Sequence, residues 1–177
     1  MLQMNENKIT SQWTPEVFSW LKKTKISVLS SPPSERSHYL VLVEKSSKGL
    51  RLDADLLSSE CQKDLLLQIK ERELETLKEP LILTYKKNLY CLIEKSPLKT
   101  SSSQKGRELG ALAAKKLSSY PIKNIILSSG QDISSLSLFL GYASGLYELK
   151  TFKEKKKQKE QGTKKFAENI FLLTKEN

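Results

Sequence analysis

The fold of this chain is decided by residues 104–149, where two helix-like stretches enclose a strand-like one. They read QKGRELGALAAKKL (104–117), IKNIIL (122–127) and DISSLSLFLGYASGLYEL (132–149). The outer two place apolar residues at the three- and four-residue spacing of a helix that buries one face, and the middle one is rich in isoleucine. Pro121 ends the first helix. Alternation of helix and strand predicts an α/β sheet.

Each of these two helices has a start signal in the sequence. Ser102 or Ser103 is placed to cap the first helix, and Asp132 the second. Gly141 and Gly145 lie one turn apart in the second, although glycine inside a helix costs about 1 kcal/mol relative to alanine. We therefore expect this helix to pack closely on the sheet. The expected apolar faces are Leu109, Leu112, Ala113 and Leu117 in the first helix, and Ile133, Leu136, Phe139, Leu140, Ala143, Leu146 and Tyr147 in the second.

The rest of the chain supplies further strands and one more helix. Ser59 and Gln62 have the spacing of a capping box, and Pro80 is expected to stop the helix that follows. Residues 46–49 are read as a loop. In chain order we expect a strand at 26–29, a buried central strand at 38–45, a helix over 63–77, a hairpin of 81–85 and 89–93, and a final strand within 166–173.

These elements predict one α/β domain with a sheet covered by helices on both faces. A length of 177 residues suits a single domain with a real core. The predicted boundaries are an N-terminal extension at 1–24, the α/β domain at 25–152, a lysine-rich loop at 153–165 and a last strand at 166–177.

Composition excludes several classes of protein. Apolar residues make up 38% of the chain and charged residues 28%, a balance typical of a folded soluble domain. No run of 18 apolar residues is present, and the first eight residues lack an apolar signal core. Two cysteines are too few for a disulfide framework. We therefore expect a cytoplasmic protein without a membrane-spanning helix.

The positive charge is local. The net charge is +10, and residues 150–165 hold eight lysines against two glutamates, a net of +6. This segment has no arginine and only one aromatic residue, Phe152, and so lacks the interleaved pattern of specific base recognition. Non-specific, salt-sensitive nucleic-acid binding through it is one functional alternative, and a solvated loop is the other interpretation.

No catalytic, cofactor-binding or metal-ligating residues are predicted in this chain. His38 is the single histidine, and no Gly-x-Ser-x-Gly motif is present, so we interpret it as structural. Cys61 and Cys91 are 30 positions apart and cannot complete a four-ligand zinc site; we interpret them as a residue near a helix start and a buried strand residue. Asp53 and Asp55 are interpreted as a solvated strand end or turn.

One junction could contact a small ligand. Ser128-Ser-Gly-Gln-Asp132 follows a strand and precedes a helix, where α/β sheets contact their ligands. The segment has one glycine and no phosphate-loop pattern, and Asp132 would repel a phosphate. Binding of ADP-ribose or a nucleotide here is a second alternative.

Residues 104–157 also resemble a known family. The sequence contains GRELGALAAKKL (106–117), IKNIIL (122–127) and LFLGYASGLYELKTFKEKK (138–156). This order of an alanine-rich helix, a short strand and a glycine- and tyrosine-containing helix resembles the N-terminal domain of the cytosol (leucyl) aminopeptidase family. Gly141, Tyr147, Phe152 and Lys153 match its recurring positions.

The resemblance implies a macro-domain-like fold, with a mixed sheet flanked by helices on both faces, and a role without catalysis. In that family a C-terminal domain removes N-terminal amino acids from peptides with two divalent metals, zinc or manganese, and carries an Asn-Thr-Asp-Ala-Glu-Gly-Arg motif. That motif is absent from these 177 residues, so no catalytic or metal-binding residue is carried over. The implied partners are the peptidase domain and neighbouring subunits of a hexamer. The alternative is a stand-alone macro-like binder of ADP-ribose or a nucleotide.

Overall fold

The computed structural model describes residues 24–53, 57–95, 101–128, 132–154 and 167–173, with side chains only to residue 146 in the last helix. They form a seven-stranded sheet in the order β1-β7-β6-β2-β5-β4, with β3 beside β2. The strands are β1 (Lys25–Leu29), β2 (His38–Ser46), β3 (Gly49–Asp53), β4 (Leu81–Tyr85), β5 (Asn88–Glu94), β6 (Asn124–Ser128) and β7 (Asn169–Leu173). The helices are α2 (Ser59–Glu71), α3 (Ser102–Leu117) and α4 (Ser135–Glu154).

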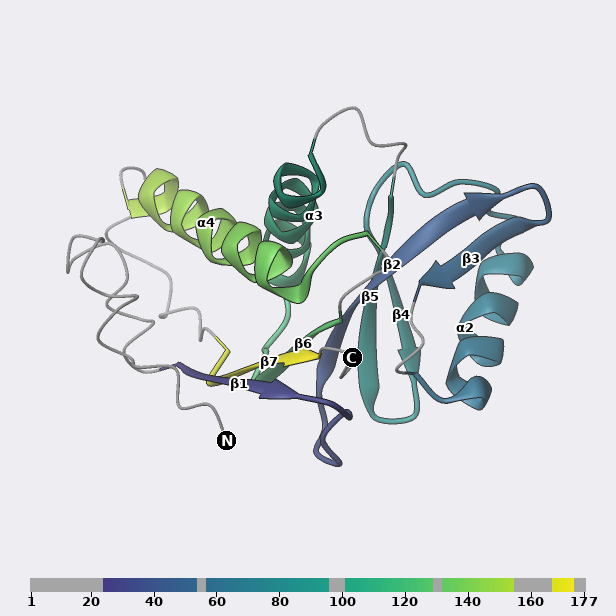
Figure 1. Cartoon of the computed structure of the whole chain (residues 1–177), viewed down its shortest axis with the longest axis horizontal. Coiled ribbons are helices and arrows are strands. Elements are labelled where there is room, and N and C mark those ends of the chain that lie inside the picture. Colours follow the sequence, from purple (N-terminus) through teal and green to yellow (C-terminus); the bar gives the residue numbers. More distant parts are fainter. Residues whose placement is uncertain (1–23, 54–56, 96–100, 129–131, 155–166, 174–177) are drawn as a thin grey trace.

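The sheet is mixed, and helices lie on both of its faces. Strands β1, β7, β6, β2 and β5 run parallel, while β3 and β4 run antiparallel to their neighbours β2 and β5. Figure 1 shows α3 and α4 together over one face and α2 beside β3 and β4. The predicted fold class is therefore confirmed.

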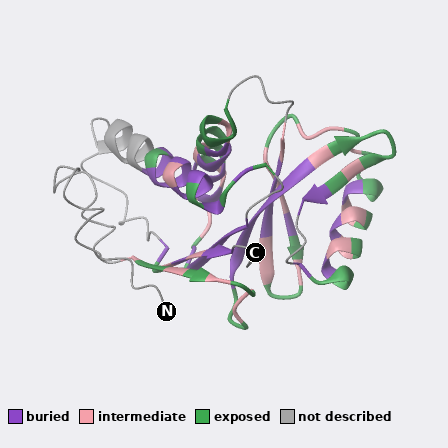
Figure 2. Ribbon diagram, in the orientation of Figure 1, coloured by how far each residue is buried: buried purple, intermediate pink, exposed green. Residues whose placement is uncertain are grey.

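Strand β2 is the centre of the sheet, as predicted. Its first six residues, His38–Val43, are all buried (Figure 2). On one side β2 pairs with β5. On the other side its residues 38–40 pair with β6, and its residues 42–46 pair with β3. The sequence predicts the loop at 46–49 but not strand β3, which follows it. Gly49 adopts φ 110° in the turn, a conformation that suits glycine, and the chain returns directly along β2.

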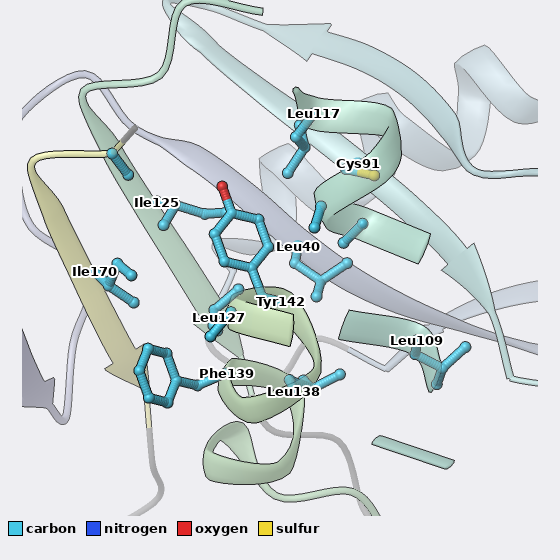
Figure 3. Close-up of a cluster of buried hydrophobic side chains, with 14 of the residues drawn as sticks. Leu40, Cys91, Leu109, Leu117, Ile125, Leu127, Leu138, Phe139, Tyr142 and Ile170 are labelled. Carbon is cyan, nitrogen blue, oxygen red and sulfur yellow. The ribbon is translucent and has the colours of Figure 1, made fainter. Parts of the chain in front are cut away.

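Each face of the sheet has its own hydrophobic core. Figure 3 shows Tyr142 and Phe139 of α4 lying among Ile125, Leu127 and Ile170 of the strands. On the opposite face Leu65 and Ile69 of α2 pack with side chains such as Val41, Leu83 and Leu92. The two cores alternate along β2, because successive strand residues point to opposite faces.

Helix α2 is capped one residue before the predicted position and ends six residues before the predicted end. Ser58, not Ser59, is the N-cap, and its hydroxyl accepts from the Cys61 amide at 3.3 Å. The Gln62 side chain donates to the Leu57 carbonyl at 2.9 Å. The helix ends before Glu73, whose φ of 53° is not helical. Leu74 and Leu77 still pack on the core, which explains the apolar pattern that extends past the helix.

The other two helices also start at different caps. Ser101, rather than Ser102 or Ser103, caps α3 and accepts from the Gln104 amide. At the start of α4, Ser134 accepts from the Ser137 amide at 3.2 Å, whereas Asp132 is exposed ahead of the helix. Two expected face positions are also wrong, because the side chains of Leu112 and Leu136 are 44% and 52% exposed. Tyr147, Phe152 and Lys153 lie in α4, but their side chains are outside the described part of the structure.

The glycines of α4 pack on α3, not on the sheet as predicted. A Cβ on Gly141 would lie 1.9 Å from the carbonyl oxygen of Arg107, and one on Gly145 would lie 2.9 Å from the backbone of Ala111. Gly110 of α3 faces α4 in the same way, because a Cβ there would lie 2.1 Å from the carbonyl oxygen of Leu138. The two helix backbones are therefore close enough to exclude side chains between them.

The segments at the ends of the predicted domain are described only in part. Strand β7 lies between β1 and β6, so the chain after the lysine-rich segment returns to the same sheet. Residues 1–23 and 155–166, which hold most of the predicted extension and lysine-rich loop, lie outside the described residues.

Gly141→Ala tests the close contact between α3 and α4, because the substitution could either raise or lower the free energy of unfolding. Helix propensity favours alanine by about 1 kcal/mol, but the new methyl group would overlap the Arg107 carbonyl. We expect the free energy of unfolding in urea to fall by about 3 kcal/mol. Ser144→Ala, at an exposed position of α4, is the control and is expected to change it by less than about 0.5 kcal/mol. A stabilised Gly141→Ala protein would contradict this packing.

Candidate functional site

The carboxyl ends of the central strands, where α/β sheets often bind ligands, are filled by a cluster of three charged side chains. The Lys95 ammonium lies 2.7 Å from Asp53 Oδ2 and 2.5 Å from Glu44 Oε1. These residues come from the end of β3, from β2 and from just after β5. The side chains of Lys95 and Asp53 are only 9% exposed. Asp53 is therefore a buried ion-pair partner, not the predicted solvated strand end.

The environment of Lys95 favours its charged form. Burial pulls its pKa down, but hydrogen bonds and charge interactions with Asp53 and Glu44 outweigh burial and raise the pKa above its usual value. An amine held in its protonated form is neither a nucleophile nor a base. The ion pairs of Lys95 link β2, β3 and the residue after β5. Lys95 and Glu44 were not among the predicted site residues. The feature of the sequence that could have indicated this cluster is a lysine, Lys95, directly after the buried strand β5. Asp55 is outside the described residues.

The predicted Ser128–Asp132 junction is only partly described. Ser128 ends β6 and is 3% exposed, and Asp132 is exposed on the far side of residues 129–131, which are not described. The described part of this junction therefore offers one buried hydroxyl and one exposed carboxylate.

His38 lies at the opposite, amino end of the central strand. It is 7% exposed, and its Nδ1 has no hydrogen-bond partner among the described residues. Burial and the positive charge of Arg36 lower its pKa, against a smaller opposite effect from a hydrogen bond to the backbone of Asn124. Beside it, Asn124 donates to the Glu35 side chain and accepts from Asn169. These contacts fasten the loop before β2 to the sheet and agree with a structural histidine.

The two cysteines lie on opposite faces of the sheet. Cys91 belongs to the core under α3 and α4, whereas Cys61 belongs to the core under α2. Burial raises the pKa of Cys91 to about 12 and also raises the pKa of Cys61. Both thiols are buried and free. Their predicted positions, in a strand and near a helix start, are confirmed.

A small cavity adjoins Cys61, at the amino ends of β2 and β5. Its volume is about 210 Å³, and it is lined by the first turn of α2, the turn between β4 and β5 and the loop before β2. One wall is formed by the parallel rings of Tyr39 and Tyr90, whose centroids are 4.7 Å apart. Tyr90 is hydrogen-bonded to Cys61, and burial is the main cause that raises the pKa of Tyr90. These tyrosines were not predicted from the sequence, because they belong to different strands.

The described residues hold neither a metal-ligand cluster nor a membrane-spanning helix. They contain no group of three His, Cys, Asp or Glu side chains that could bind a metal ion. None of the helices in the described ranges is long and apolar enough to cross a membrane. The described donors therefore do not fit the pair of divalent metals that the aminopeptidase resemblance implies for another domain.

Lys95→Met tests whether the charged cluster stabilises the sheet. The substitution leaves Asp53 and Glu44 without their shared ammonium, and we expect the free energy of unfolding in urea to fall by about 3 kcal/mol. Lys105→Met, in the more exposed pair with Glu108 on α3, is the control, with an expected change below about 0.5 kcal/mol. Replacing Asp53 with Leu as well is expected to recover part of the loss. Equal effects of the two lysine substitutions would contradict the assignment.

The free energy of unfolding is expected to decrease as the pH is lowered, because His38 titrates. Its folded-state pKa lies below the ordinary value of about 6.5, so the unfolded chain binds more protons as the pH drops below that value. The contribution of neutral His38 is complete above about pH 6.5 and is lost as the pH falls below it. Urea unfolding between about pH 7.5 and 5.5 should show a steeper decline for the parent than for His38→Gln. Identical pH slopes would disprove the role of His38.

Comparison with known proteins identifies a likeness of fold. No protein-family model matches the chain, and no curated protein sequence matches it. Among solved structures, it is similar to a mutant of tomato leucine aminopeptidase, with a TM-score of 0.61 and 15% sequence identity. The alignment covers 87% of this chain and 33% of the tomato chain, so this chain spans about one third of that enzyme's length. The described domain therefore shares its fold with part of a leucine aminopeptidase.

Proposed function

We propose that this chain is the non-catalytic N-terminal domain of a leucyl-aminopeptidase-like protein, with a role in docking and assembly. The observation that carries the proposal is the structural likeness over 87% of this chain to one third of a leucine aminopeptidase. The sequence resemblance over residues 104–157 supports the same relationship independently of the coordinates.

The chemistry of the described residues supports a role without catalysis. The charged side chains at the carboxyl end of the sheet pair with one another, and His38 and both cysteines are buried. Peptide hydrolysis in the proposed protein would be the work of a separate C-terminal domain with two divalent metals. Docking to that domain and to neighbouring subunits of a hexamer, in the cytoplasm, is part of the proposal.

Intact mass and peptidase activity test this function together. We expect the native product to be much heavier than 20.1 kDa and to hydrolyse Leu-p-nitroanilide with Mn²⁺ or Zn²⁺, while residues 1–177 do not. Removing residues 1–177 from the native product should lower its oligomeric state in light scattering. Hydrolysis by residues 1–177, or a native product of 20.1 kDa, would refute the proposal.

The two alternatives stay predictions. The lysine-rich segment and residues 129–131 lie wholly or mostly outside the described structure. Calorimetry with ADP-ribose tests small-ligand binding at the Ser128–Asp132 junction. DNA retention after Lys155, Lys156 and Lys157 are replaced by Gln tests nucleic-acid binding by the lysine-rich segment.

A further inference from the structure

The cavity beside α2 has features of a ligand site that the proposed function does not use. It lies at the amino ends of β2 and β5, away from the charged cluster at their other ends. Pro32 and Leu57 contribute apolar surface, and Ser58, Cys61 and Lys86 contribute polar atoms. At about 210 Å³ the cavity suits a small organic molecule and not a nucleotide.

Tyr39 supplies a hydroxyl group at the cavity. Its side chain is 5% exposed and lines the cavity, yet its hydroxyl has no hydrogen-bond partner among the described residues. The neighbouring Tyr90, stacked on it at an angle of 14°, shares a hydrogen bond with Cys61. The buried side-chain polar atom without a partner in the described residues is His38 Nδ1, so the Tyr39 hydroxyl is reached by solvent through the cavity. It is therefore available to a molecule in the cavity.

The charged groups around the cavity favour a ligand that carries a single negative charge. Helix α2 has 13 residues, and its N-terminus, capped by Ser58, lies at the cavity. The first amides of a helix attract anions, and the Lys86 ammonium adds a full positive charge. Glu60 and Asp64 lie nearby on α2 and oppose a second negative charge. A monoanionic carboxylate fits this balance better than a phosphate dianion does.

We propose that this cavity binds a small aromatic carboxylate. The ring contacts the apolar surface of Leu57 and Pro32 and the wall of stacked tyrosines. The carboxylate accepts a hydrogen bond from the Tyr39 hydroxyl and is neutralised by Lys86. This proposal is independent of the assembly role proposed above.

Titration with benzoate, followed by amide NMR shifts, tests the site. We expect saturable shifts centred on the amides of Glu60, Cys61 and Lys86, with a Kd of about 1 mM for so small a ligand. Tyr39→Phe should weaken binding about fivefold, and Lys86→Gln about threefold. Lys87→Gln, in the same turn but outside the cavity lining, is the matched control and should leave the Kd unchanged. Benzyl alcohol should bind at least about tenfold more weakly.

A stability measurement separates binding from folding effects. Because the Tyr39 hydroxyl has no partner in the described fold, Tyr39→Phe should leave the melting temperature without benzoate unchanged or higher. Benzoate should raise the melting temperature of the parent more than that of Tyr39→Phe. The proposal is overturned by a clearly lower melting temperature of ligand-free Tyr39→Phe, by equal binding of benzyl alcohol, or by shifts that do not saturate at these amides.

Discussion

Burial of β2 on both faces is the constraint on which the rest of the fold depends. Six consecutive residues, His38–Val43, are shielded from solvent, so apolar layers must cover the sheet on each side. Helices α3 and α4 provide one layer and α2 provides the other. The pairing of β2 changes from β6 to β3 along its length, so this one strand joins the parallel half of the sheet to the antiparallel part. Polar side chains lie at the two ends of this buried strand.

The two ends of β2 differ in what their polar groups leave available. At the carboxyl end, Lys95 is held by two carboxylates, and the position usual for ligands in α/β sheets is occupied by the protein's own charges. At the amino end, Asn124 ties the preceding loop to the sheet, while the hydroxyl of Tyr39 faces a cavity. Of these described polar groups, the Tyr39 hydroxyl at the amino end is the one that lines a cavity.

The sequence predicts what short-range patterns determine. The buried run at 38–45, the hairpin around Lys86 and the alternation after residue 104 identify the fold class, and each is present in the structure. The sequence does not predict features that depend on contacts between distant segments. Nothing local to Gly141 indicates that its neighbour is Arg107 instead of a strand, and nothing near Tyr39 indicates its stacking on Tyr90. Serine-rich segments also offer several possible caps, so the caps at Ser101 and Ser134 lie one or two residues from the predicted positions.

The placement of the two cysteines gives the protein a pair of internal reporters. Cys61 is buried under α2 and Cys91 under α3 and α4, with the sheet between them. Cys61 borders the cavity, so a small thiol reagent can approach it from there. Cys91 can be reached only when the layer formed by α3 and α4 opens, so its rate of modification measures that opening. The sheet also keeps the sulfurs apart, so oxidation within a folded monomer cannot join them. The two thiols thus report separately on the cavity side and on the α3–α4 side of the sheet in the unmodified chain.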